Sequence, residues 1–190
     1  MLIGDCFYTI IDYRIIDYRM LIIGGIIMSN TTKKLSLAGM FLALNIILSS
    51  FGVPVPGGKF YFNDIAIVAA AIVLDPLYAT LAGGVGAFLG DFFFYPTPMF
   101  VSLAVRALQS FVISWLVHKN KTDASKWVGV LLGAVIMVVG YSLGRAFIYS
   151  TPEYAVIKLP YQILQSAIGV IFGSLIANKA VVNKIIKEDK

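Results

Sequence analysis

Arg106 lies inside a segment that is otherwise suited to the interior of a lipid bilayer. Counted from Pro98, it is eight residues into this segment, which is about 12 Å along a helix that rises ~1.5 Å per residue. The hydrocarbon core is about 30 Å thick, and a guanidinium group near its middle costs about 2.5–3.5 kcal/mol even on lenient insertion scales. We therefore predict that Arg106 faces a partner, a cavity or a ligand. From Phe100 to Leu116 the apolar run is interrupted only by Ser102, Arg106, Gln109, Ser110 and Ser114.

The composition indicates a membrane protein of one domain. Hydrophobic residues make up 59% of the 190 residues and charged residues 13%, against roughly a quarter charged in ordinary soluble domains. The net charge of +5 comes from basic residues grouped at 33–34, 118–126 and 179–190. Short basic loops and ends fit the positive-inside rule better than a nucleic-acid surface. The single cysteine, Cys6, excludes an internal disulfide.

The first 27 residues differ in character from the rest of the chain. They contain the pentapeptide Ile-Ile-Asp-Tyr-Arg twice in succession, at 10–14 and 15–19, and an apolar run that is too short to span a bilayer. From Met28 the chain is polar and basic and then continues into an apolar helix. We interpret residues 1–27 as a non-native extension of the reading frame and 28–190 as a single membrane domain. An interfacial amphipathic helix is the alternative for the extension.

Charge parity decides the number of spans. Residues 60–74 are short for a span, but the basic ends at 33–34 and 118–126 should share the cytoplasmic side, which requires an even number of crossings between them. We therefore predict an all-α, multi-pass protein of a prokaryotic plasma membrane, with both termini cytoplasmic. Its six transmembrane helices are expected at about residues 35–51, 60–74, 76–95, 99–117, 127–149 and 157–182.

Polar residues inside the predicted spans gather toward the outer side of the membrane. A polar cavity that is open outward and dry inward favours a binding site over a channel, which needs polar faces through the full thickness. Each of these residues also has a possible structural role without a ligand. Asp91 and Arg106 could form an ion pair, Tyr149 could belong to the aromatic belt at the membrane interface, and Lys158 could extend to the lipid headgroups. Gln162 and Gln165 could form hydrogen bonds to neighbouring helices. The residues that could meet Arg106 from other segments are Asp91, Arg145, Gln162 and Gln165.

The chain carries small-residue stripes but no pattern typical of catalysis. In the third span Gly83, Gly84, Gly86 and Gly90 favour close helix packing, whereas Gly39 and Ala43 of the first span could meet another protein. The lone histidine, His118, lies beside a basic loop. The sequence lacks a metal-binding cluster, a phosphate-binding glycine loop and a nucleophile–base pair. We expect neither an enzyme nor a bound cofactor or metal.

Three segments resemble a known family. They are 61–67 (Tyr-Phe-Asn-Asp-Ile-Ala-Ile), 74–86 (Leu-Asp-Pro-Leu-Tyr-Ala-Thr-Leu-Ala-Gly-Gly-Val-Gly) and 90–92 (Gly-Asp-Phe). With six spans and a small-residue first helix, the chain is similar to the substrate-binding S components of energy-coupling factor (ECF) vitamin transporters, nearest to the hydroxymethylpyrimidine and riboflavin group. The likeness covers about residues 33–179. Arg106 stands where the family pattern has lysine, and Asn63 stands where glycine commonly precedes the aspartate.

This resemblance implies a vitamin-binding subunit that docks through its first helix, at Gly39 and Ala43, onto a transmembrane coupling subunit driven by two cytoplasmic ATPases. Those partners, and not this chain, would hydrolyse ATP. We expect hydroxymethylpyrimidine or pyridoxine as the ligand, with riboflavin or pantothenate as alternatives. The alternatives from other functional classes are a stand-alone permease, a membrane scaffold and an intramembrane enzyme. The candidate binding residues, with Phe60 and Tyr61 in a lid, are Phe60, Tyr61, Asn63, Asp64, Asp91, Arg106, Gln109, Tyr141, Arg145, Gln162 and Gln165.

Overall fold

The computed structural model describes residues 30–56, 58–120 and 122–179. The chain divides into two compact units, Met1–Lys33 and Lys34–Lys190, and every described strand lies in the second. The interpretation of residues 1–27 as an extension, and the last three residues of the predicted sixth span, fall outside the described residues.

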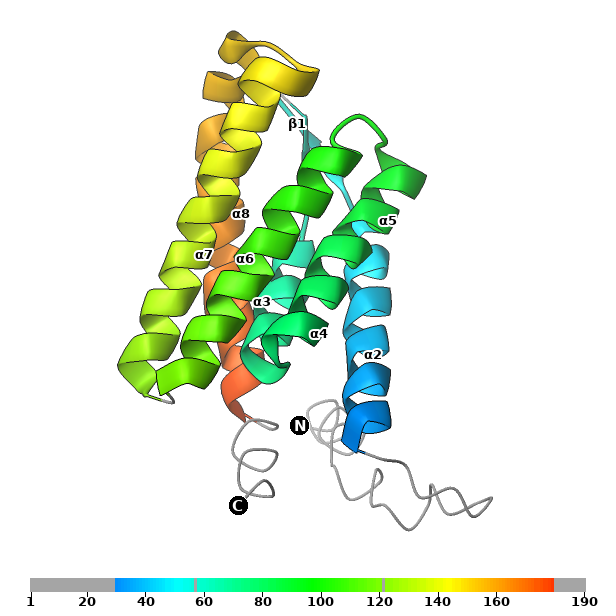
Figure 1. Cartoon of the computed structure of the whole chain (residues 1–190). Coiled ribbons are helices and arrows are strands. Elements are labelled where there is room, and N and C mark those ends of the chain that lie inside the picture. The colour runs from blue at the N-terminus through cyan, green and yellow to red at the C-terminus, as the bar shows by residue number, and fades with distance from the viewer. Residues whose placement is uncertain (1–29, 57, 121, 180–190) are drawn as a thin grey trace, which may run out of the picture. The chain divides into compact units, whose positions relative to one another are not determined.

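Helices dominate the described chain (Figure 1). The elements before the midpoint are α2 (Asn30–Ser50), β1 (Val53–Val55), β2 (Gly58–Phe60), α3 (Asn63–Val73), α4 (Pro76–Thr80), the π-helical turn η1 (Leu81–Val85) and α5 (Gly86–Phe94). The later elements are α6 (Met99–Asn120), α7 (Asp123–Gly144), the π-helical turn η2 (Arg145–Tyr149) and α8 (Pro152–Lys179). Because α4, η1 and α5 follow one another without a break, they form one rod, and η2 likewise prolongs α7.

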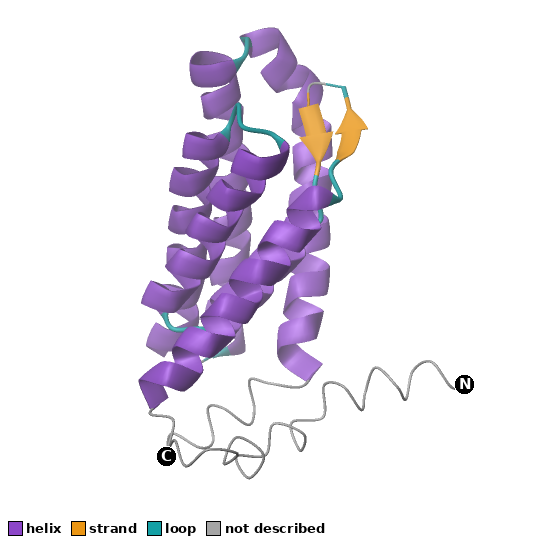
Figure 2. Ribbon diagram, turned by 90° about the vertical axis from the view of Figure 1, so that its right-hand side faces the viewer, coloured by secondary structure: helices purple, strands orange, loops and turns teal. Residues whose placement is uncertain are grey.

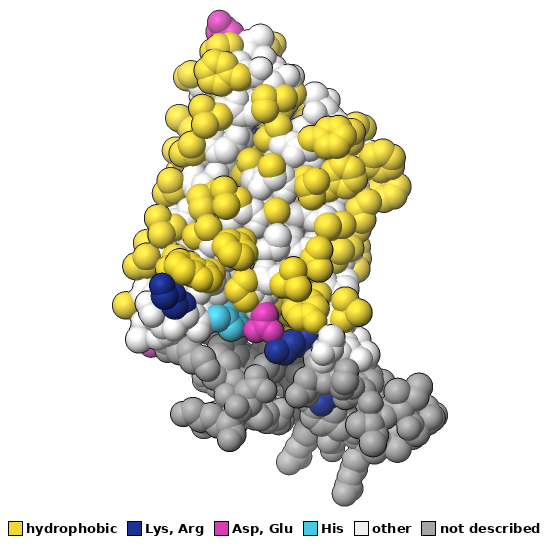
Figure 3. Space-filling view, in the orientation of Figure 1, with side chains coloured by type: hydrophobic (Ala, Val, Ile, Leu, Met, Phe, Trp, Pro, Cys, Tyr) yellow, Lys and Arg dark blue, Asp and Glu magenta, His cyan; other side chains and the backbone are white. Residues whose placement is uncertain are grey.

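Five described helices are long and apolar enough to cross a membrane, and α3 is a shorter apolar helix. Figure 3 shows the matching surface: hydrophobic side chains cover most of the visible face, and the charged side chains lie toward its two ends. The predicted class, an α-helical membrane protein, is confirmed. Which end faces the cytoplasm stays a prediction.

The short helix α3 is the buried centre of the helix bundle. It packs against α8, α6 and η1, and its seven residues from Ala66 to Ile72 are each at most 2% exposed. A helix that is apolar on every side belongs inside a bundle. Its eleven residues span only about 16 Å, but both ends meet protein. At one end the Ser114 hydroxyl donates to the Leu74 carbonyl (2.5 Å), so α3 need not reach both membrane surfaces itself.

A small hairpin stands where the prediction extended the second helix. Phe60 belongs to β2, which pairs antiparallel with β1, and α3 begins only at Asn63. The predicted span 60–74 was therefore too long at its start. Gly58 has a φ of +145°, a conformation that favours glycine and opens the second strand. Figure 2 shows the hairpin at one end of the bundle.

Other helix ends also differ from the predicted ones. α7 starts at Asp123 and not at residue 127, because the Thr122 side chain accepts a hydrogen bond from the Ser125 backbone N–H (3.2 Å) and caps the helix. α8 starts at Pro152, five residues before the predicted bound, since proline is well suited to a first helical turn. α6 continues to Asn120.

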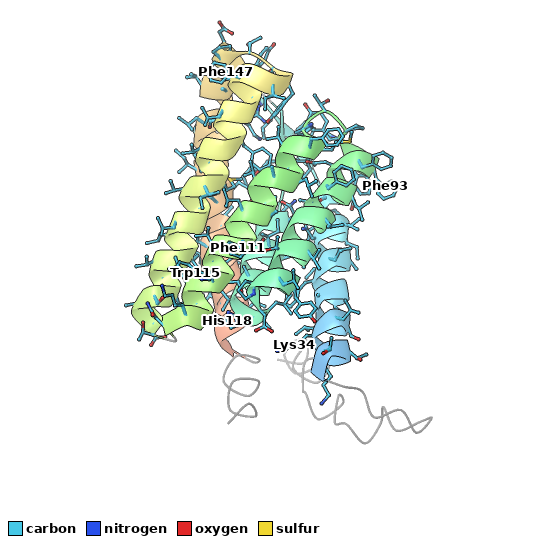
Figure 4. The ribbon with its side chains drawn as sticks, viewed as in Figure 1. Lys34, Phe93, Phe111, Trp115, His118 and Phe147 are labelled. Atoms are coloured by element: carbon cyan, nitrogen blue, oxygen red, sulfur yellow. The ribbon has the colours of Figure 1, made fainter. Side chains whose placement is uncertain are left out.

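Lys34 of α2 and the end of α6 lie at the same end of the bundle, as the parity argument requires. The Lys34 ammonium is 2.8 Å from an Asp75 carboxylate oxygen, and His118 Nε2 is 3.9 Å from the other oxygen. Figure 4 shows Lys34 and His118 toward one end and Phe93 and Phe147 toward the other. Four helical passes therefore separate the two basic regions.

Candidate functional site

A polar chamber lies at the hairpin end of the bundle, among α3, α5, α6, α7, η2 and α8. The space that the centre of a water molecule can occupy is about 30 Å³, so its own side chains nearly fill it. The chamber is lined by Lys59, Tyr61, Asn63, Asp91, Tyr95, Pro98, Arg106, Met137, Tyr141, Arg145, Tyr149, Lys158, Gln162 and Gln165.

Arg106 is 1% exposed and all three of its guanidinium nitrogens have partners. Its two terminal nitrogens donate to the two carboxylate oxygens of Asp64, at 3.0 Å for Nη2. Nη1 also donates to Gln109 (2.9 Å), and Nε donates to the Tyr141 hydroxyl (3.3 Å). A two-pronged arginine–carboxylate pair is the strong form of this interaction. The pairing of Arg106 with Asp91, which we weighed from the sequence, is wrong: its partner is Asp64, at the first turn of α3.

Asp91 on α5 takes a different partner. It accepts a hydrogen bond from the Ser102 hydroxyl, and that hydroxyl in turn accepts one from Tyr141 (2.7 Å). Because Tyr141 also accepts a hydrogen bond from Arg106, a hydrogen-bonded chain links Asp64 and Asp91 through residues of four helices, α3, α5, α6 and α7. Asp91 is 6% exposed and lines the chamber.

Gln165 on α8 connects Asp64, behind Arg106, to Tyr61, the residue that follows the hairpin. Its amide nitrogen donates to Asp64 (2.6 Å), and its carbonyl oxygen accepts from the Tyr61 backbone N–H (3.3 Å). Burial raises the pKa of the Tyr61 phenol, and the charge on Asp91 adds to the shift. This phenol is therefore neutral at physiological pH and can donate a hydrogen bond.

Two further cations lie at the hairpin side of the chamber. The Lys158 ammonium donates to the Lys59 carbonyl (2.6 Å) and is only 1% exposed, so it does not snorkel to the headgroups. Arg145 donates to the Gln162 carbonyl oxygen at 3.5 Å, and its guanidinium lies over the Tyr149 ring, 5.6 Å from the centroid. Tyr149 thus lines the chamber and is not simply a belt residue.

Most of the predicted binding residues come together here, but three do not line the chamber. Phe60 packs edge-on against Phe62 with 5.4 Å between ring centroids, and Asp64 and Gln109 lie behind Arg106. The residues not chosen from the sequence are Lys59, Tyr95, Pro98, Met137, Tyr149 and Lys158. Lys158 lies four residues before Gln162 and therefore on the same face of α8, so this spacing was the available signal.

Several buried polar atoms facing this region have no hydrogen-bond partner among the described residues. They are the hydroxyls of Tyr61 and Tyr149, the carbonyl oxygen of Asn63 and the amide nitrogen of Gln162. Buried polar groups are normally paired, so a cluster of unpaired ones is typical of a ligand site.

Helix α2 also presents polar side chains to the bundle. Asn45 donates to the carbonyls of Ala82 and Gly83, both at 3.2 Å, and Ser49 accepts from the Asn63 amide (3.1 Å). Asn63 lines the chamber, so α2 connects to it through one hydrogen bond. The predicted docking residues Gly39 and Ala43 are exposed, so neither lies at the chamber.

Gly169 holds Asp64 in position by letting α8 approach α3. A Cβ at residue 169 would lie 2.6 Å from Asp64 Cβ and 3.3 Å from its backbone. Because backbone must move to relieve that contact, Gly169→Ala should lower the free energy of unfolding by about 1–3 kcal/mol. The matched control is Gly39→Ala, which meets nothing within 4 Å and should be neutral or stabilising by up to ~1 kcal/mol. Thermal unfolding in detergent measures both, and equal stability of the two variants would contradict this packing.

Comparison with known proteins shows the family to which this chain belongs. Residues 29–182 match the sequence pattern of the family described as ECF-type riboflavin transporter, S component. An uncharacterized protein of Pyrococcus woesei is 30% identical over 123 residues, which cover 64% of this chain and 82% of that protein. The thiamine precursor transporter HmpT of Lactococcus lactis subsp. cremoris is 27% identical over 150 residues, 76% of this chain and 86% of that one.

Among solved structures, one reported as the S component of a bacterial ECF transporter matches with a TM-score of 0.66 and 16% identity, covering 77% of this chain and 94% of that chain. At this identity the likeness concerns the fold. The family match covers most of the chain, including every chamber residue. The chain belongs to the S components of ECF-type transporters, and it is a multi-pass membrane subunit of vitamin uptake.

Proposed function

We propose that this chain captures a small vitamin or vitamin precursor in the polar chamber and delivers it to an ATP-driven ECF complex. The observation that carries this proposal is the polar chamber at one end of an otherwise apolar bundle. Four buried polar atoms that have no partner among the described residues face that region. Lys59 of the hairpin and Tyr61, which follows it, cover the chamber. The complex would comprise a transmembrane coupling subunit and two cytoplasmic ATPases in a prokaryotic plasma membrane.

The size of the chamber favours a small ligand. About 30 Å³ is open within it, so any vitamin must displace the hairpin or its side chains. Hydroxymethylpyrimidine, pyridoxine or pantothenate would need less displacement than riboflavin. The name of the Lactococcus lactis relative, a thiamine precursor transporter, supports a vitamin precursor. The ring of Tyr141 beneath Arg106, with 5.1 Å to its centroid, adds aromatic surface beside the polar groups.

A direct test combines ligand identification with dependence on ATPases. The full chain, purified natively, should carry a vitamin that mass spectrometry identifies, and should bring down a coupling subunit with two ATPases. Calorimetric titration in nanodiscs with hydroxymethylpyrimidine, pyridoxine, riboflavin and pantothenate should find one tight binder. Uptake of that vitamin should stop when the ATPases are inactivated. Uptake that continues without them would favour a stand-alone permease instead.

A further inference from the structure

We propose that Arg145 and Lys158 form an anion-binding subsite in the chamber, so the transported ligand carries a carboxylate or a phosphate. This inference rests on the proposed function, since it assumes that the chamber holds the transported ligand. It extends that function by naming the chemical group that the chamber recognises and the side chains that bind it.

The chamber has an excess of positive charge. Four cationic side chains line it, those of Lys59, Arg106, Arg145 and Lys158. Two carboxylates oppose them, Asp91 in the lining and Asp64 behind Arg106, which leaves a net charge of +2. The Asp64 carboxylate is already held by Arg106 on both oxygens. The excess positive charge therefore lies on the hairpin side of the chamber.

Arg145 and Lys158 carry this surplus in buried positions. They are 6% and 1% exposed, and among the described residues neither has a carboxylate within 4.0 Å. A buried charge is costly unless it is paired and hydrogen-bonded. Arg106, at a similar degree of burial, has that compensation from Asp64. The contrast between the arginines separates a structural ion pair from a cation available to a ligand.

The hydrogen-bonding groups around these cations are mainly donors. Among the described residues the Lys158 ammonium, which has three protons, contacts one acceptor, the Lys59 carbonyl. Arg145 has five N–H donors and contacts one acceptor in the same part of the chain, Gln162, at the long distance of 3.5 Å. The Gln162 amide nitrogen and the Tyr149 hydroxyl are buried and have no partner among the residues that the structure describes. An oxyanion offers several acceptor lone pairs at once, and its planar or tetrahedral oxygens suit the guanidinium fork.

The hairpin covers this subsite. Gly58 is close enough that a Cβ added to it would lie 3.4 Å from Arg145 Nη2, and Lys158 is bonded to the neighbouring Lys59 carbonyl. An anion bound by both cations would therefore lie under β2. Among the candidates above, pantothenate alone has a fixed carboxylate, so this chemistry places it first. A phosphorylated form of either ring compound is the other source of an oxyanion.

Matched ligand pairs that differ in one charged group test the subsite. We would titrate the full chain in nanodiscs with pantothenate and panthenol, nicotinate and nicotinamide, and pyridoxal phosphate and pyridoxal. A charged hydrogen bond in a desolvated site contributes about ten- to 150-fold in affinity, so the charged member of the recognised pair should bind more tightly by that factor. The first two pairs report a carboxylate and the third a phosphate.

Variants then connect the charge preference to these residues. Arg145→Gln and Lys158→Met should each reduce the affinity ratio within the recognised pair by tenfold or more. That ratio is measured on the folded fraction of a single variant, so reduced folding does not change it. Lys119→Gln, which removes an exposed cation stacked on Trp115, should leave the ratio unchanged.

Two outcomes would overturn the subsite. One is a neutral vitamin that binds tightly while its charged counterpart gains nothing, and the other is a charge preference that persists in both variants. Either result would leave the capture function intact, because a vitamin would still bind. If no vitamin bound and uptake did not depend on ATPases, the proposed function itself would fail, and the subsite with it.

Discussion

Replacing Arg106 by alanine should lower the free energy of unfolding by about 3–5 kcal/mol, the range expected when one partner of a buried ion pair is removed. Asp64 would lose its ion-pair partner in a site where it is 1% exposed, and among the described residues the Gln165 amide would be its remaining side-chain donor. The hydrogen bond from Arg106 to Tyr141 would also be lost. We expect both reduced stability and the loss of tight vitamin binding.

A double replacement separates these two effects. In Asp64→Leu/Arg106→Met both charges are gone, and apolar replacements of a buried pair are often neutral for stability. The double variant should therefore recover most of the stability that Arg106→Ala loses. It should still bind the vitamin poorly, because it lacks the Arg106 guanidinium that lines the chamber. Denaturant unfolding and calorimetric titration measure the two quantities on the same preparations.

The exposed pair Lys34–Asp75 provides the control. Its side chains are 43% and 39% exposed, and solvent-exposed ion pairs contribute about 0–1 kcal/mol. Lys34→Ala should therefore cost no more than ~1 kcal/mol. If Arg106→Ala were as mild as Lys34→Ala, the Arg106–Asp64 pair would not be the structural centre of the chamber.

The sequence predicted that Arg106 needs a partner but could not identify it. Asp64 and Asp91 both lie in neighbouring spans, and the choice between them depends on helix rotation and crossing, which hydrophobic patterns do not specify. Local hydrogen bonding explains the outcome: Asp91 is held by Ser102, while Asp64 projects from the first turn of α3 toward α6. Spacing likewise placed Lys158 beside Gln162 on α8, but only tertiary burial distinguishes a chamber residue from a snorkelling one.

The second span was also predicted only in part. Charge parity predicted a helix that crosses between the first and third spans, and α3 is the short apolar helix found at that place in the chain. Its full burial was not predicted, because ten apolar residues fit either a lipid-facing or a protein-covered helix. The hairpin was missed for a different reason. Pro54 lies in β1, and proline argues against a strand except at an edge, which is where this short pair lies.

Large side chains at Gly39 and Ala43 should abolish transport while leaving vitamin binding intact. The two residues are four apart, so they share one face of α2, and both are exposed. Only 11% of the apolar window of α2 is buried in the chain, against 28–44% for the other four long apolar helices. The face of α2 that points into the bundle is already packed against α5, since a Cβ at Gly86 would lie 2.7 Å from Asn45 Nδ2. Within the described part of the chain the outward small-residue face is exposed, and we propose that it docks onto a coupling subunit.

The test compares Gly39→Trp and Ala43→Trp with Leu132→Trp, which adds the same ring at a position 46% exposed on α7. All three should fold, since no Cβ contact exists within 4 Å of Gly39 and the other two sites are exposed. Calorimetric titration should give the parent affinity in each. Co-purification of the ATPases and ATP-dependent uptake should fail for the two α2 variants and persist for Leu132→Trp. If the α2 variants assemble and transport at the parent rate, docking must use another surface, because a tryptophan between two closely packed helices would hold their backbones apart.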